Sequence, residues 1–94
     1  MPGSAINTIS MMRNVIRNLQ QTESQNANLA GNWAQAEVKQ AAALNNNTGS
    51  VPEMASHSNQ LAGILQQFHN TANHAAFQLG NLEHMLDELE HQIH

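Results

Sequence analysis

The sequence predicts an all-α fold, an antiparallel two-helix hairpin that completes a four-helix bundle by dimerisation. Three observations support it: a long heptad repeat in the second half of the 94-residue chain, a weaker repeat in the first half, and an Asn- and Gly-rich segment between them. A chain of this size buries only about 60% of its unfolded surface, and without Cys it forms no disulfides. We therefore expect one domain, residues 1–94, that gains stability by association.

The first helix is expected at about residues 5–44, with Ser4 as its N-cap. Apolar side chains recur at alternating spacings of three and four, which is the pattern of a helix that packs along a seam. Polar residues interrupt the pattern, for example Glu23 and Glu37. The seam residues expected on this helix are Ile9, Met12, Ile16 and Leu19.

A loop is expected at residues 45–50, because Asn and Gly tolerate turn conformations and Asn competes for backbone hydrogen bonds. Directly after it, Ser50 and Glu53 have the spacing of a capping box, with Pro52 in the first helical turn between them. The chain is therefore expected to reverse direction here and to begin its second helix.

The second helix is expected at about residues 51–93, where the heptad repeat runs for six heptads and only Ser58 in the row is polar. The seam residues expected on it are Leu61, Leu65, Phe68, Leu79, Leu82, Leu86 and Leu89. If the chain turns near Thr48, an antiparallel pairing places Arg13 and Arg17 beside Glu83 and Asp87.

A second apolar row runs beside the seam on both helices, and further apolar residues lie outside it. A two-helix hairpin leaves such residues uncovered, which predicts pairing with another hairpin as a homodimer or a heterodimer. The residues expected at this partner interface are Val15, Leu29, Trp33, Ala36, Ile64, Phe77 and Met85.

Composition excludes several classes of function. The net charge is −4 with only three Lys and Arg residues, which argues against binding to nucleic acid. No apolar run approaches the roughly 20 residues of a membrane span, and no signal-peptide core is present. We expect a soluble protein, cytoplasmic or secreted without a cleavable signal peptide. Arg13 and Arg17 on an apolar helix are also typical of a mitochondrial transit peptide, which remains an alternative for the N-terminus.

The residues with chemical potential are few. Glu23 and His74 could form an acid–base pair across the hairpin, but the sequence offers no nucleophile or glycine-rich loop to accompany them. We therefore predict no enzyme activity and no cofactor.

The C-terminal residues offer an alternative function. Acidic and His side chains three and four positions apart could chelate a metal on one helix, although the heptad repeat turns them toward water. The candidate metal ligands are His84, Glu88, His91 and His94. The alternative is thus a self-associating His- and acid-rich bundle that binds a transition metal or responds to pH.

The segment Leu29-Ala30-Gly31-Asn32-Trp33-Ala34-Gln35-Ala36 resembles the Leu-x-x-x-Trp-x-Gly-x-Ala motif of the small helical-hairpin proteins of type VII (ESX) secretion. Residues 48–52 also look like the interhelical turn of the related Pro-Glu family. The chain departs from the pattern at Gln35, where Gly belongs, and Trp33 precedes the expected loop although the family's Trp lies in the turn. The chain has no Tyr for the family's export signal. The resemblance implies a non-enzymatic secreted or secretion-associated protein that pairs with a second hairpin.

Overall fold

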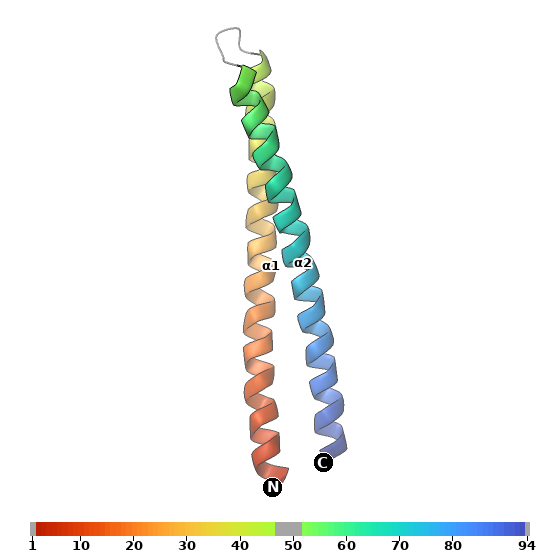
Figure 1. Cartoon of the computed structure of the whole chain (residues 1–94). Coiled ribbons are helices and arrows are strands. Elements are labelled where there is room, and N and C mark those ends of the chain that lie inside the picture. The colour runs from red at the N-terminus through yellow and green to blue at the C-terminus, as the bar shows by residue number, and fades with distance from the viewer. Residues whose placement is uncertain (1, 47–51, 94) are drawn as a thin grey trace. The chain divides into compact units, whose positions relative to one another are not determined.

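The computed structural model describes residues 2–46 and 52–93 and contains two α-helices, α1 (Pro2–Asn46) and α2 (Pro52–Ile93) (Figure 1). Each helix begins at one of the two prolines of the chain, where the missing N–H costs no intrahelical hydrogen bond. Glu53 lies in the first turn of α2, near the positive end of the helix dipole. The prediction of an all-α chain with two helices packed against each other is confirmed.

The helix bounds differ slightly from those expected from the sequence. The helix α1 was expected at about residues 5–44 and extends from Pro2 to Asn46, so the first two residues of the expected loop are helical. The rest of that loop, together with Ser50 of the capping box, lies outside the described residues. Val51, the first residue of the expected second helix, and His94 also lie outside them.

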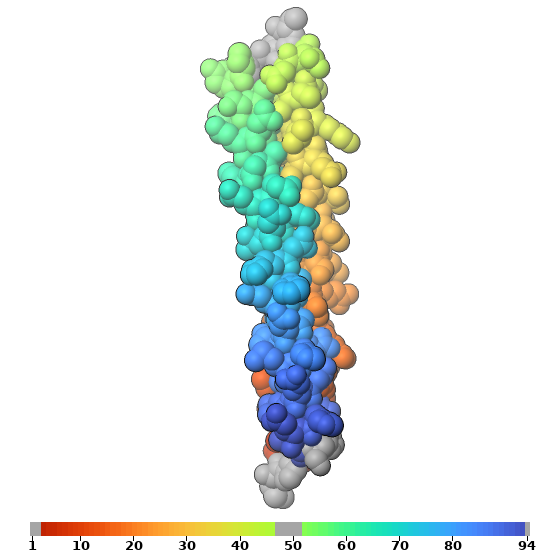
Figure 2. Space-filling view, turned by 90° about the vertical axis from the view of Figure 1, so that its right-hand side faces the viewer, coloured from red at the N-terminus to blue at the C-terminus, as the bar shows by residue number. Residues whose placement is uncertain are grey.

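The chain divides into two units, each made of a segment of α1 and a segment of α2. Unit 1 comprises Met1–Gln25 with Asn73–His94, and unit 2 comprises Asn26–Ala72. In each unit the two segments contact each other, and in unit 2 they are seen side by side in the space-filling view (Figure 2). They run antiparallel in unit 1, where Arg13 contacts Glu90 and the later Arg17 contacts the earlier Glu83.

Two heptad rows on each helix form the contact between the segments. With Ile9 and Leu65 at position a, every residue of 6–44 and 55–93 that occupies position a or e is buried or half-buried. Row a consists of Ile9, Ile16, Glu23, Ala30, Glu37 and Leu44 on α1, and of Ser58, Leu65, Ala72, Leu79, Leu86 and Ile93 on α2. Row e consists of Ile6, Arg13, Gln20, Ala27, Ala34 and Ala41 on α1, and of Ala55, Ala62, His69, Ala76, Glu83 and Glu90 on α2.

The second contact row differs from the sequence-based expectation, which had used positions a and d. Among the expected seam residues at position a, Ile9, Ile16, Leu65 and Leu86 are buried and Leu79 is half-buried. Leu61, at position d, is also half-buried. The other expected seam residues at position d, Met12, Leu19, Phe68, Leu82 and Leu89, are exposed.

The physical reason lies in the side chains of row e. Of the eleven buried hydrophobic residues among those described, seven are alanines, and five of these seven lie in row e. All five lie in unit 2, where alanine lets the two helix backbones approach closely, whereas a large row-d side chain such as Phe68 would hold them apart. In unit 1 the row-e residues Arg13, Glu83 and Glu90 instead take part in the ion pairs between the helices. The large buried residues Ile9, Ile16 and Leu86 form one cluster in unit 1, with Leu79 and Ile93 packed against it.

Candidate interaction surface

The most prominent surface feature is a set of large apolar side chains at heptad positions d and g. Of the fourteen exposed large hydrophobic residues among those described, eleven occupy these two positions. In unit 1 they are Met12, Val15, Leu19, Leu82, Met85 and Leu89, and in unit 2 they are Leu29, Trp33, Met54, Ile64 and Phe68. By helical geometry, rows d and g lie on one flank of row a, and rows e and b lie on the other. We call the residues of rows d and g the d/g face of each unit.

In unit 2 the d/g face has a hollow between the two helices. Leu29 and Trp33 of α1 and Phe68 of α2 border it, over a base that includes Ala30 and Leu65, and its volume is about 320 Å³. The Trp33 side chain is half exposed, and its indole Nε1 donates a hydrogen bond to Glu37 Oε1 at 3.1 Å, one helical turn away on α1.

The opposite flank of unit 1 carries the ion pairs between the helices. The guanidinium of Arg13 donates hydrogen bonds to Glu90 Oε2 at 2.7 Å and to Asp87 Oδ1 at 2.8 Å. Arg17 Nε donates to Glu83 Oε1 at 2.8 Å. The hydrogen bonds to Glu90 and then Asp87 raise the pKa of Arg13, so this guanidinium remains charged. The predicted placement of both arginines beside Glu83 and Asp87 is confirmed.

Charge is therefore separated from the apolar face. None of the ten Asp, Glu, Lys and Arg residues of the chain occupies position d or g on either helix. Seven of them lie at positions a, b and e, and the other three lie at position c. The d/g face of each unit thus combines large exposed apolar side chains with the absence of formal charge.

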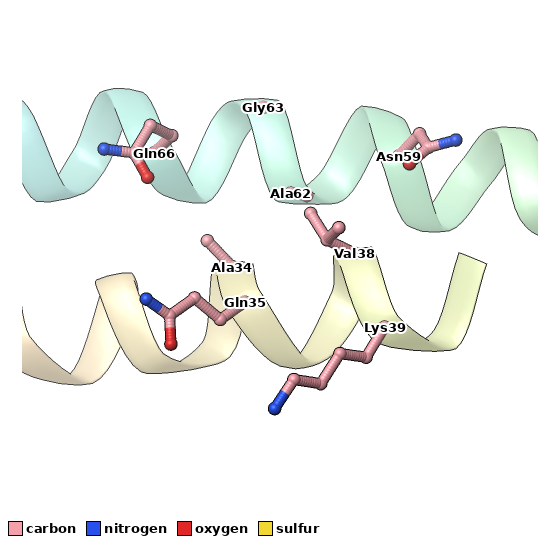
Figure 3. Close-up of a pocket in the computed structure, with 8 residues that line it drawn as sticks. All are labelled: Ala34, Gln35, Val38, Lys39, Asn59, Ala62, Gly63 and Gln66. Atoms are coloured by element: carbon pink, nitrogen blue, oxygen red, sulfur yellow. The ribbon is translucent and has the colours of Figure 1, made fainter. Parts of the chain in front are cut away.

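A groove lies on the other flank of unit 2 (Figure 3). Ala34 and Val38 of α1 point toward α2 across it, whereas Lys39 points away (Figure 3). Its volume is about 500 Å³, and it exists because Ala34, Ala62 and Gly63 leave little side-chain volume between the helices. Apart from Val38 it offers no large exposed apolar residue, so it is a poorer docking surface than the d/g face.

All residues expected at a partner interface are exposed in the structure. Val15, Leu29, Trp33, Ala36, Ile64 and Met85 belong to the d/g faces of the two units. Phe77 is equally exposed but occupies position f, away from both flanks of row a. The sequence-based set therefore omitted Met12, Leu19, Phe68, Leu82 and Leu89 because they had been assigned to the seam between the helices.

The acidic and His side chains near the C-terminus do not assemble into a metal site among the described residues. His84 Nε2 lies 3.3 Å from Glu88 Oε1, and both side chains are exposed. No group of three or more His, Asp or Glu side chains in residues 2–46 and 52–93 is placed to hold a metal ion. Of the candidate ligands, His94 lies outside this range.

One contact in unit 2 was not foreseen from the sequence. His69 Nδ1 lies 2.6 Å from the backbone carbonyl oxygen of Ala27, and since a carbonyl only accepts, Nδ1 must carry the donated proton. A Cβ added to Gly31 would lie 3.0 Å from the same Nδ1. Gly31 therefore provides the space in which the His69 ring reaches α1.

Trp33, in the segment that resembles the type VII motif, lies inside α1, which ends at Asn46. Neither helix, over the part of the chain that is described, is long and apolar enough to cross a membrane. Comparisons with protein-family models, curated proteins and solved structures found no match to this chain.

Proposed function

We propose that this chain is a non-enzymatic helical interaction protein whose d/g faces pair with another helical hairpin to form a four-helix bundle. The observation that supports this most is the position of the exposed large apolar residues. Of the fourteen among the described residues, eleven lie in two of the seven heptad rows. Scattered exposed hydrophobic residues are ordinary on protein surfaces. The concentration of most of them in two adjacent rows is typical of a surface that another protein covers.

The geometry of helical bundles gives a physical reason for this proposal. Each helix of a four-helix bundle has two neighbours and therefore carries an apolar stripe wider than one contact requires. Here rows a and e serve the first neighbour, which is the other helix of the same chain. Rows d and g on the other flank remain for a second neighbour.

The energetics favour a binding function over an isolated hairpin. Among the described residues no large side chain is fully buried, and only four of the buried hydrophobic residues are larger than alanine. Covering exposed apolar surface contributes roughly 25 cal/mol per Å². Association therefore supplies the apolar burial that each chain lacks by itself.

The experiment is to purify the tagged full chain from the cells that naturally make it and to determine the mass of its assembly by light scattering. Phe68→Glu places a carboxylate in the d/g face, and Val38→Glu is the matched control, since both residues are exposed to nearly the same extent, 54% and 53%. We expect the original chain and Val38→Glu in an assembly heavier than 10.3 kDa, and Phe68→Glu at the mass of one chain. A single-chain mass for the original protein, or an unchanged assembly in Phe68→Glu, contradicts the proposal.

Export by a type VII system remains a prediction from the motif at residues 29–36 and is separate from the pairing proposal. It is tested by measuring the protein in the culture medium of cells with and without a functional type VII system. Equal amounts in both media would count against export by this route.

A further inference from the structure

We propose that the protein covering the d/g faces is a second copy of this chain. The inference rests on the proposed function and adds the identity of the partner. A homodimer requires a surface that is complementary to itself in charge, in area and in shape. The structure bears on each of these three requirements.

Charge is the first requirement. A chain of net charge −4 repels its own copy wherever like charges face each other. The d/g faces carry no formal charge, and the interhelical ion pairs of unit 1 lie on the opposite flank, formed by Arg13 with Asp87 and Glu90. Two copies that meet through these faces bring no like charges together. A partner selected by opposite charge would find no group on this face to pair with.

Area is the second requirement. The eleven large side chains of the d/g faces are each 45–68% exposed. Together they present on the order of 1,000 Å² per chain, compared with about 800 Å² per partner in a stable protein–protein interface. The uncovered surface of one chain is therefore large enough for a stable dimer, without a contribution from the groove beside Val38.

Shape is the third requirement, and unit 2 supplies the evidence. Its d/g face combines a hollow of about 320 Å³ with projecting side chains of Leu29, Trp33 and Phe68 at the border. A cavity of about 150 Å³ already accepts a benzene molecule, so the hollow has room for a large side chain. In a two-fold contact, a side chain of the first copy that enters the second copy's hollow is matched by the reciprocal insertion. The face thus carries both the projection and the recess that self-pairing needs.

The deciding experiment measures the mass of the chain in the absence of all natural partners. The full chain is produced in an unrelated host, purified and examined by light scattering over a dilution series from about 100 µM to about 1 µM. We expect twice the 10.3 kDa chain mass at high concentration and dissociation on dilution. A single-chain mass across the series overturns the homodimer.

The two proposals fail in different ways. If the chain from the unrelated host is a monomer while the chain from its natural cells is in a larger assembly, the second copy is excluded and a different hairpin is the partner. If both preparations are monomeric, the proposed function fails as well. The two preparations must therefore be measured in the same buffer and at the same chain concentration.

The location of the dimer contact is tested with Phe68→Glu and the control Val38→Glu. A carboxylate buried without a counter-charge is strongly disfavoured, so Phe68→Glu is expected to weaken self-association by about 100-fold or more. Val38→Glu is expected to leave it unchanged. Circular dichroism reports whether each variant remains helical, and an unchanged association in a helical Phe68→Glu variant overturns the proposed location.

A second probe does not depend on a variant that carries a new charge. The chain has no Cys, so a single introduced Cys is its only maleimide target. Leu29→Cys lies in the d/g face, and Phe77→Cys is the matched control at position f, since both native side chains are 68% exposed. Labelling of Leu29→Cys is expected to slow several-fold as the concentration rises, and labelling of Phe77→Cys to stay constant. If light scattering shows a dimer but Leu29→Cys is labelled at the same rate at all chain concentrations, the contact lies elsewhere and the inference is overturned.

Discussion

Gly31→Ala, measured with and without His69, tests whether Gly31 is present to make room for that ring. The His69 ring is held by a 2.6 Å hydrogen bond to the Ala27 carbonyl, and a Cβ at residue 31 would lie 3.0 Å from Nδ1 and 3.3 Å from Cε1. Contacts this short force the ring to move. Because Nδ1 is both the clashing atom and the hydrogen-bonding atom, the ring cannot retreat without lengthening the bond to Ala27.

Two opposing effects set the expected magnitude. Replacing an interior helical glycine by alanine stabilises a helix by about 1 kcal/mol where the new methyl group has space. Weakening the hydrogen bond costs about 0.5–1.5 kcal/mol. We therefore expect Gly31→Ala to leave the free energy of unfolding nearly unchanged, or to lower it, when His69 is present. In a His69→Ala background the same change should raise it by about 1 kcal/mol, which gives a coupling energy of about 1 kcal/mol.

The assay is urea unfolding of the four proteins of this double-mutant cycle, followed by circular dichroism at one fixed chain concentration because association shifts apparent stability. Gly63→Ala is the control, since no atom lies within 4 Å of a Cβ at that position. It should gain about 1 kcal/mol in both backgrounds. Equal effects of Gly31→Ala in the two backgrounds would refute the idea that Gly31 accommodates His69.

Three further predictions concern the seam, the ion pairs and the apolar face. Ala34→Leu should lower the free energy of unfolding in urea by about 1–3 kcal/mol, because a larger side chain in a seam of alanines forces the helices apart. Ala42→Leu, on the exposed side of the same helix, is the control and should have little effect. Equal effects of the two changes would contradict a close-packed seam. Arg13→Gln should lower the melting temperature in about 0.01 M salt and much less in about 1 M salt, where the screening length falls from about 30 Å to about 3 Å. Lys39→Gln is the control, since Lys39 has no ion pair among the described residues. A fall in melting temperature of Arg13→Gln that is the same at both salt concentrations would argue against an electrostatic role of Arg13. Peroxide oxidation of Met12, Met54 and Met85 makes these exposed d/g side chains polar and should weaken association, as light scattering would detect. A variant with Leu at all three positions that loses association equally would locate the sensitive methionine outside the d/g face.

The sequence alone determined the helical period, the all-α class and the antiparallel pairing of Arg13 and Arg17 with acids of the second helix. The first two follow from local rules, because apolar residues spaced three and four apart lie on one face of a helix. The pairing follows because one reversal of the chain direction between two helices determines which residues lie opposite each other. The sequence also identified row a, which includes the buried Ile9 and Leu86.

Only the tertiary structure decided which flank of row a faces the other helix. The apolar character of Met12 and Phe68 favoured row d as the row that faces the other helix. Rows d and e lie on opposite flanks of row a, so the sequence pattern is compatible with either row facing it. Alanines permit the closer backbone approach, and Arg13 reaches Glu90 only when row e is turned inward. The large side chains of row d thereby remain exposed. The contact between His69 and Gly31 is likewise invisible in the sequence, since it depends on residues of two helices meeting at one level of the seam.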